Sequence, residues 1–453
     1  MQENIPEILT IPALQQGYKQ GDFTPAEVLN AIAARARETA DNPIWITAPG
    51  EAVYGKYLAA LPPMDFAAYP LWGIPFAIKD NIDLAGVPTT AACPAYAYTP
   101  KESATVVQKL IAAGAIPVGK TNLDQFATGL VGTRSPYGEV HNAWQPELIS
   151  GGSSSGSAVS VALGQAAFAL GTDTAGSGRV PAMLNTLVGY KPPVGSWSTC
   201  GVVPACASLD CVTVFAHTLA EAEAVDAVAR GVDEACAWSR TIPLQKEQLP
   251  AVILLPAEEP TFYGDWAAGY RRKWQHAVAR LRTLGLPVRE VSTAEFSAAA
   301  RLLYDGAYVA ERWADIGPFV ESHPGATFPV TEKILRSGGR PELTAAQLFE
   351  DLHQLALYRR HAATLLGNAV LVLPTAGGTF TRAEVAADPV ATNSQMGLYT
   401  NHCNLLDLAA VAIPENSRDH EYPAGLTLFS LAANEHLIRA TARAFLATEE
   451  ESL

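Results

Sequence analysis

Two clusters of serine and glycine lie close together in the sequence and carry the residue types of a nucleophilic site. Residues 151–157 read Gly-Gly-Ser-Ser-Ser-Gly-Ser, and residues 171–179 read Gly-Thr-Asp-Thr-Ala-Gly-Ser-Gly-Arg. The first cluster alone is also typical of a flexible linker. It runs, however, directly into a helical pattern over 157–166 and then into a short apolar strand pattern. Because a glycine-rich turn beside a helix points several backbone N–H groups at one anionic centre, we predict an oxyanion site here.

A serine nucleophile needs a base, and histidine is the usual one. None of the nine histidines lies inside either cluster, although a distant one can still fold close to them. Lysine is the other known base, and it works only when burial lowers its pKa from about 10.4 toward neutrality. Lys79 meets this demand because it ends the apolar run 72–78. The alternative for Lys79 is a solvated lysine at the end of a strand.

Together these segments resemble the amidase-signature enzymes. The resemblance rests on residues 73–80, Gly-Ile-Pro-Phe-Ala-Ile-Lys-Asp, on both serine and glycine clusters, and on the spacing between Ser153 and Ser177. It implies Ser177 as the nucleophile, Ser153 in a cis peptide linkage as the proton shuttle, and Lys79 as the base. It further implies an oxyanion hole made by the backbone N–H groups of Thr174, Ala175, Gly176 and Ser177.

Within that family the sequence is most similar to the allophanate hydrolases. This resemblance implies that a tyrosine and an arginine recognise the substrate carboxylate, and we assign them to Tyr304 and Arg312, with Gly129 as a further substrate-binding residue. On one helix over 294–315, eight residues at about 100° each place the two side chains about 80° apart, so they share a face. The alternative for Arg312 is an exposed surface arginine. The similar segments are 122–135, 202–206, 208–211 and 399–401.

The resemblance implies hydrolysis of the terminal amide of allophanate, which releases ammonia and leaves N-carboxycarbamate, as a step of urea degradation in nitrogen metabolism. It also implies a homodimer and a functional link to a biotin-dependent urea carboxylase. Two other amide hydrolases stay open: a malonamidase-like enzyme, and the glutaminase subunit of a tRNA amidotransferase, which needs a partner protein. A catalytically silent binding subunit is the alternative from another class, and retention of Lys79, Ser153 and Ser177 argues against it.

Two other motifs are matched in letters but lack their structural context. Residues 114–121 fit the phosphate-loop pattern, yet a helical pattern precedes them and a strand pattern lies inside them, which is not the required strand–loop–helix order. Residues 152–156 fit Gly-x-Ser-x-Gly, but 144–148 do not form the strand that precedes a nucleophile elbow. No His-Glu-x-x-His motif is present, and the cysteine and histidine spacings do not suggest zinc. We therefore expect neither a cofactor nor a metal.

Apolar runs typical of buried strands alternate with helical patterns, which predicts an α/β sandwich with a mostly parallel or mixed sheet. The resemblance implies an α/β/α sandwich with a large mixed central sheet. A capping box with proline at the first helical position opens a helix over 24–40. The predicted strands are 71–78, 116–118, 168–170, 252–255, 370–373 and 411–413. The other predicted helices are 104–113, 157–166, 218–230, 265–284, 294–315, 343–366 and 434–447, and 379–395 is expected to be a loop.

The length of 453 residues leaves one or two domains open. The resemblance implies a single amidase domain over 1–453, with an N-terminal helical layer over about 1–60. The allophanate hydrolases also carry a further C-terminal domain, which we expect to be absent from this sequence because it ends at Leu453.

The composition excludes several classes of partner. Hydrophobic residues make up 49% and charged residues 17%, which is enough apolar surface for a large core. The formal charge of −14 argues against nucleic acids and anionic membranes, so local cations must hold any anionic substrate. The six cysteines form no Cys-x-x-Cys pair, and neither a targeting segment nor an apolar run of about 18 residues is present. We expect a reduced, cytoplasmic protein.

Overall fold

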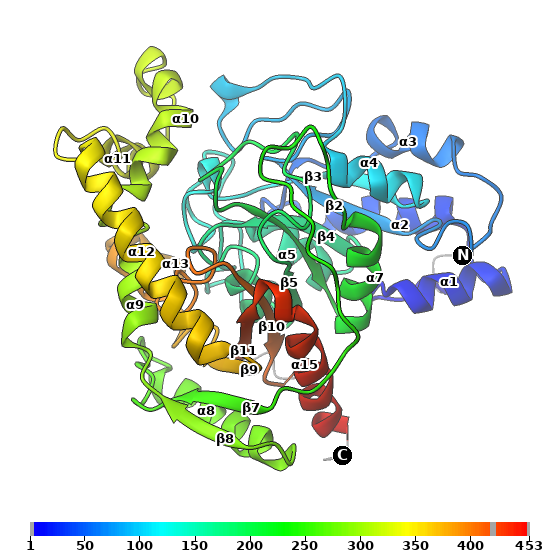
Figure 1. The fold of residues 1–453 in the computed structure, drawn as a ribbon. Helices are drawn as coiled ribbons and strands as arrows, with labels where there is room; N and C mark the ends of the chain where they lie inside the picture. Colours follow the sequence, from blue (N-terminus) through cyan, green and yellow to red (C-terminus); the bar gives the residue numbers. More distant parts are fainter. Residues whose placement is uncertain (1–3, 417–422, 451–453) are drawn as a thin grey trace.

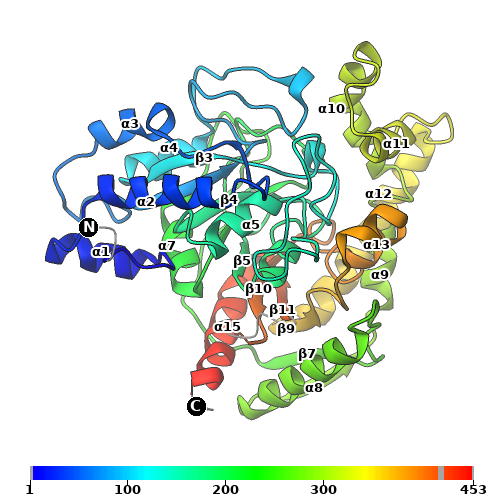
Figure 2. The same ribbon diagram turned by 180° about the vertical axis from the view of Figure 1, so that it is seen from behind.

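The computed structural model describes residues 4–416 and 423–450, which Figure 1 shows from one side and Figure 2 from behind. An 11-stranded mixed sheet runs through this part of the chain in the order β1-β3-β2-β4-β6-β5-β10-β11-β9-β7-β8. The expected α/β class with a large mixed sheet is confirmed. The strands are β1 Trp45–Thr47, β2 Pro75–Lys79, β3 Ile116–Thr121, β4 Phe168–Asp173, β5 Val188–Lys191, β6 Cys211–Ala216, β7 Val252–Pro256, β8 Val288–Val291, β9 Ala369–Pro374, β10 Leu408–Pro414 and β11 Gly425–Leu431.

Helices cover both faces of this sheet. In the N-terminal half they are α1 Ile11–Gln20, α2 Pro25–Glu38, α3 Glu51–Ala59, α4 Thr105–Ala112, α5 Ser155–Ala162, α6 Val180–Leu184 and α7 Leu219–Ala229. In the C-terminal half they are α8 Ala267–Thr283, α9 Ala294–Arg301, α10 Tyr308–Ser322, α11 Pro329–Ser337, α12 Ala345–Leu366, α13 Arg382–Ala387, α14 Ala391–Met396 and α15 Glu435–Glu450. Within the described residues, no helix has the length and apolar character needed to cross a bilayer.

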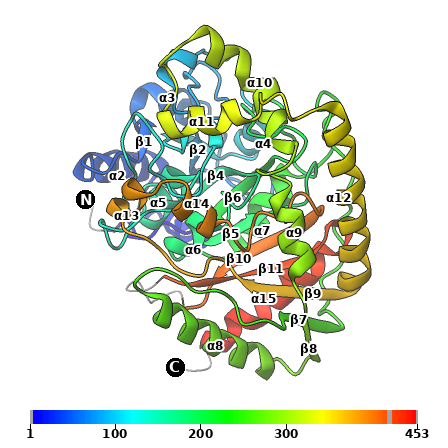
Figure 3. The same ribbon diagram turned by 90° about the vertical axis from the view of Figure 1, so that its left-hand side faces the viewer.

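The two faces are distinguished at β5, because successive residues of a strand point to opposite sides. Tyr190 points to one face, where its hydroxyl accepts a hydrogen bond from Arg439 Nε of α15 (3.1 Å). Gly189 lies on the other face against Ala182 of α6, where a side chain would collide. Helices α7, α15 and α8 pack on the first face, and α5, α6, α9 and α12 pack on the second. Figure 3 shows α12 running along one edge of the molecule.

The N-terminal helices follow their sequence signals closely. Thr24 caps α2 and forms a capping box with Glu27, and Pro25 is the first helical residue, as predicted. Apolar side chains at helical spacing, Val28 and Ile32 among them, are fully buried in the main core. The local propensity and the tertiary packing therefore agree over this helix.

The single helix predicted over 294–315 is wrong. Helix α9 ends at Arg301 and α10 begins at Tyr308, and a turn joins them. The Ala307 N–H donates to Asp351 Oδ2 of α12 (2.6 Å), a long-range contact that replaces a helical hydrogen bond. This tertiary contact overrides an apolar pattern that reads as continuous in the sequence.

The loop predicted over 379–395 is also wrong, because it holds α13 and α14. Thr381 caps α13 and forms a capping box with Glu384, a sequence signal that the pattern analysis missed. Strands β1, β5, β6, β8 and β11 were not predicted either. Most of the missed strands have no more than six residues, which gives them little periodicity.

The segment 114–121, which fits the phosphate-loop pattern in letters, forms strand β3 with every residue of that strand buried. Lys120 Nζ lies 3.2 Å from Asp80 Oδ1, with both side chains fully buried. It also donates a hydrogen bond to Thr89 Oγ1 (3.0 Å). Lys120 thus neutralises a carboxylate inside the protein and is not presented to a ligand.

Replacing Lys120 by methionine is expected to lower the free energy of unfolding by about 3–5 kcal/mol, because the Asp80 carboxylate would stay buried without its counter-charge. Chemical unfolding followed by tryptophan fluorescence measures the change. Adding Asp80→Asn to this variant should recover much of the loss, since the second change removes the unpaired charge. A single variant as stable as the parent would contradict the role of the ion pair.

Candidate active site

The three predicted catalytic residues come from segments that the sheet brings to one edge. Lys79 ends β2, and Ser177 follows the end of β4. Because β2 and β4 are parallel neighbours, their carboxyl ends meet at the same edge of the sheet. Ser153 lies just before α5, which packs on both strands.

Lys79 is completely buried, and its ammonium group contacts two hydroxyls. The Nζ donates to Ser153 Oγ (2.7 Å) and to Thr172 Oγ1 (2.8 Å). Burial lowers the pKa of Lys79 to about 7, because the charged form loses its hydration, while nearby carboxylates act in the opposite direction. A large part of the Lys79 population is therefore neutral near pH 7 and able to accept a proton. Sequence reasoning missed Thr172, although it belongs to the second serine and glycine cluster.

The peptide bond between Gly152 and Ser153 is cis. Only glycine fits at position 152, because a Cβ there would lie 2.1 Å from Asp124 Oδ2. The same carboxylate lies against Gly129, where a Cβ would be 2.5 Å from Oδ2. Asp124 thus packs against both Gly152, which precedes Ser153, and Gly129, whose carbonyl accepts from Ser177.

The Ser177 side chain is buried, and its Oγ donates to the Gly129 carbonyl at a distance of 3.4 Å. The predicted relay needs two contacts, one between Lys79 and Ser153 and one between Ser153 and Ser177. Among the hydrogen bonds of the described residues, the structure shows the first contact and not the second. Gly129, which the resemblance assigned to the substrate, accepts from the nucleophile in this conformation.

Three of the four predicted oxyanion donors have a free N–H. Among the described residues, the backbone N–H groups of Thr174, Ala175 and Ser177 donate to no protein acceptor. The Gly176 N–H instead donates to Asp173 Oδ1 (2.8 Å). The three free donors follow β4, and one of them is the N–H of Ser177 itself.

A buried ion pair holds the backbone of this segment. Asp173 accepts from Gly176 N–H, from Gly178 N–H (3.0 Å) and from two nitrogens of Arg179 (2.9 Å each). Burial alone would raise the pKa of Asp173, but the Arg179 guanidinium and these N–H groups hold it below its usual value. Arg179 also donates to the carbonyl of Thr400 (3.2 Å). These contacts explain why aspartate and arginine accompany the glycines of the second cluster.

The structure brings Tyr304 and Arg312 together, although not on one helix. Tyr304 lies in the turn before α10, and its hydroxyl accepts from Arg312 Nη2 (3.5 Å). The guanidinium carbon lies 5.2 Å from the centre of the Tyr304 ring, and Nη1 donates to Thr128 Oγ1 (3.2 Å). Arg312 is 1% exposed, so the alternative of a surface arginine is wrong. Its Nε has no hydrogen-bond partner, which is unusual for a buried cation.

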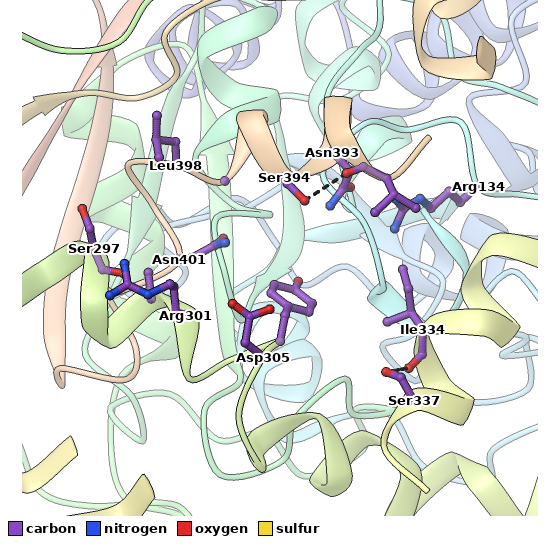
Figure 4. Close-up of a pocket in the computed structure, with 14 residues that line it drawn as sticks. Arg134, Ser297, Arg301, Asp305, Ile334, Ser337, Asn393, Ser394, Leu398 and Asn401 are labelled. Atoms are coloured by element: carbon purple, nitrogen blue, oxygen red, sulfur yellow. Dashed lines mark hydrogen bonds between the residues drawn. The ribbon is translucent and has the colours of Figure 1, made fainter. Parts of the chain in front are cut away.

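A cavity of about 450 Å³ has Tyr304 in its wall, whereas Arg312 is not among the residues that line it. Figure 4 shows the side chains that line it, which come from α9, α11, α14 and the loops between them. Arg134 and Asn393 stand in one part of the wall, and Arg301 and Asn401 stand in another. In the described part of the chain, no group of three or more histidine, cysteine, aspartate or glutamate residues is placed to hold a metal ion.

The sequence matches a protein-family model and a set of curated proteins. The protein-family model described as Amidase matches residues 56–438. The chain is 42% identical over 418 residues to a urea amidolyase of Lachancea kluyveri, a match that covers 90% of this chain and 23% of that protein. It is 45% identical over 365 residues to a urea amidolyase of Saccharomyces cerevisiae, covering 79% of this chain and 20% of that protein. The chain thus spans less than a quarter of the length of these curated relatives.

Solved structures of similar proteins match nearly the whole of this chain. Allophanate hydrolase of Kluyveromyces lactis shares 36% identity with a TM-score of 0.88, over 97% of this chain and 72% of that one. A glutamyl-tRNA(Gln) amidotransferase subunit from Thermotoga maritima shares 25% identity with a TM-score of 0.78, over 96% of this chain and 94% of that one.

A serine-directed fluorophosphonate reports on this site without any assumption about the substrate. The rate at which it labels Ser177 is expected to rise with pH and to level off above an apparent pKa of about 7. Below that pKa Lys79 is protonated and cannot accept the serine proton, whereas above it the base is neutral. Labelling rates between about pH 5 and pH 9 test this profile across the working range of a general base.

Two variants complete the measurement. Lys79→Met should label slowly at every pH, and Ser177→Ala should not label at all. A parent rate that does not change with pH would remove Lys79 from the role of base.

Proposed function

We propose that this chain, which belongs to the amidase family, hydrolyses the terminal amide of allophanate to ammonia and N-carboxycarbamate. One observation carries the choice of substrate: Arg312 is a buried cation beside Tyr304 that, among the described residues, forms no ion pair with a carboxylate. The 36% identity to an allophanate hydrolase over nearly the whole chain supports the same choice.

In this proposal Lys79 is the base and Ser153 carries the proton. Ser177 Oγ turns from the Gly129 carbonyl toward Ser153, gives up its proton and attacks the carbonyl carbon of the amide. Neutral Lys79 accepts the proton that Ser153 passes on. A lysine with a pKa of about 7 suits this role, because it gains and loses a proton near the working pH.

The tetrahedral intermediate carries its negative charge on the former carbonyl oxygen. The free N–H groups of Thr174, Ala175 and Ser177 are the donors that we assign to it. Ser153 then returns the proton to the nitrogen, the C–N bond breaks, and ammonia leaves. Water attacks the remaining ester of Ser177 by the same relay, which releases N-carboxycarbamate and restores the serine.

The other end of allophanate is a carboxylate, and we assign its recognition to Arg312 and Tyr304. A planar guanidinium binds a carboxylate through two parallel hydrogen bonds, and a tyrosine hydroxyl donates a third. The protein carries a formal charge of −14, so this anion gains no long-range attraction and depends on local cations.

We further propose a cytoplasmic homodimer that acts in urea degradation together with a biotin-dependent urea carboxylase. The free state of all six cysteines supports a reducing compartment. Similarity to part of two urea amidolyases supports the link to urea metabolism. Sedimentation of the purified chain tests the dimer.

The purified chain alone is expected to release ammonia from allophanate and to leave glutamine and malonamide essentially unchanged. A coupled ammonia assay with each amide at equal concentration makes the comparison. Ser177→Ala is the control, because it keeps the fold and removes the nucleophile. Turnover of glutamine that appears only with a partner protein would favour a tRNA amidotransferase subunit instead, and no turnover with any amide would favour a silent binding subunit.

Arg312→Leu is expected to reduce kcat/KM for allophanate far more than for biuret, in which an uncharged amide replaces the carboxylate. A hydrogen bond to a charged group contributes about 1.5–3 kcal/mol, or roughly 10- to 150-fold in kcat/KM. Arg312→Lys keeps the charge but loses the fork, so its loss should be intermediate. Equal losses on allophanate and biuret would mean that Arg312 supports the fold and not the ligand.

A further inference from the structure

Two buried arginines meet at one threonine beside the cavity. Arg312 Nη1 donates to the side chain of Thr128, and Arg134 Nη1 donates to the carbonyl of the same residue (3.0 Å). Each guanidinium is 1% exposed, and the Nε of each has no hydrogen-bond partner. Arg134 comes from the loop after η2 (Gln125–Ala127), and Arg312 comes from α10, so tertiary structure alone places them together.

Carboxylates lie near both guanidinium groups, Asp124 near Arg134 and Asp210 near Arg312. Among the described residues, no carboxylate forms an ion pair with Arg134 or Arg312. The Asp124 carboxylate accepts from three backbone N–H groups, that of Arg134 included (2.9 Å), and not from the Arg134 guanidinium. Burial lowers the pKa of Arg134, and the Arg312 charge acts in the same direction, whereas the Asp124 carboxylate raises it.

Two like charges held together out of water, neither of them in an ion pair, destabilise the free protein. A ligand that brings one negative charge relieves both the repulsion and the unmet hydrogen-bonding capacity. The geometry therefore favours a small anion, because each guanidinium keeps N–H groups free for it.

We propose that Arg134 is a second specificity-determining cation, which binds the substrate carboxylate together with Arg312. This inference rests on the proposed function and adds a residue to its site. Arg134 and Tyr304 both line the cavity of about 450 Å³, and the Tyr304 hydroxyl accepts from Arg312, so a small carboxylate at this wall lies next to Arg134 and next to the tyrosine that contacts Arg312. Figure 4 shows Arg134 and Arg301 on different sides of this cavity.

The arrangement selects substrates by charge and by length. A neutral amide leaves two buried cations unpaired, whereas a molecule with a carboxylate at a short distance from its amide pairs them. Asp305, which also lines the cavity, is exposed and disfavours anions that stop at the rim. Short carboxylated amides such as allophanate, and small dicarboxylates such as malonate as inhibitors, are the chemical class that this site accepts.

Arg134→Met and Arg134→Lys form the test pair. Both lose the fork that holds Thr128 and the Pro389 carbonyl (2.6 Å), and only lysine keeps the charge. Arg134→Met is expected to reduce kcat/KM for allophanate by about 10- to 100-fold and for biuret by less than about threefold, since only allophanate has a carboxylate to lose. Arg134→Lys should recover part of the loss on allophanate. Arg282→Met is the matched control, because Arg282 is exposed on α8, pairs with Glu290 at the surface and does not line the cavity, so it should change neither substrate by more than about twofold.

Equal losses on allophanate and biuret, or equal effects of methionine and lysine, would overturn the proposal and leave Arg134 with a structural role. If neither variant folds, a crystal structure of the parent with malonate decides: a carboxylate oxygen within hydrogen-bond distance of the Arg134 guanidinium supports the proposal, and malonate on Arg312 alone overturns it. Turnover of allophanate by the parent is measured first. Failure at that step contradicts the proposed function, whereas failure of the variants contradicts only the role of Arg134.

Discussion

The rest of the site depends on one constraint, which is that a lysine must be buried and still be hydrogen-bonded. Lys79 suits the proposed role of base because it has no exposed surface, and burial lowers its pKa to about 7. Burying the Lys79 amine without hydrogen-bond partners would cost free energy. The hydroxyls of Ser153 and Thr172 supply two acceptors that carry no charge. The parallel pair β2 and β4 creates this environment, because it places Lys79 and Thr172 side by side between two layers of helices.

Burial also determines the properties of Arg134 and Arg312, but these residues keep the charge that buried Lys79 readily loses. Arg179 and Lys120 are buried in ion pairs with carboxylates and stabilise the fold, whereas Arg134 and Arg312 form no such pair among the described residues. Arginine keeps its proton when buried, so an unpaired guanidinium stays a standing charge that a ligand can neutralise. An acidic protein can hold a small anion in this way because the interaction is local and largely shielded from its net charge.

The residues with chemical roles could be predicted from the sequence more fully than the contacts that position them. The nucleophilic cluster, Lys79 and the pairing of Tyr304 with Arg312 could be predicted, because they lie in dense motifs or match a family pattern. The break in the helix over 294–315 could not, since Asp351 causes it from another helix. Arg134 was overlooked for a similar reason, because its proximity to Arg312 arises only after folding.

A chain of contacts fixes the distance between the two ends of the site. Glu311, next to Arg312 on α10, accepts from the N–H and the hydroxyl of Ser208 (2.7 Å each). Two residues further along, Asp210 accepts from the Thr174 hydroxyl, so the same loop holds the segment that carries the oxyanion donors. Burial raises the pKa of Asp210 to about 6, yet N–H groups of its own loop keep the carboxylate oriented. Arg312, to which we assign the carboxylate, and the donors that we assign to the amide oxygen are therefore held on one hydrogen-bonded framework, which would fix the distance between the two ends of the substrate.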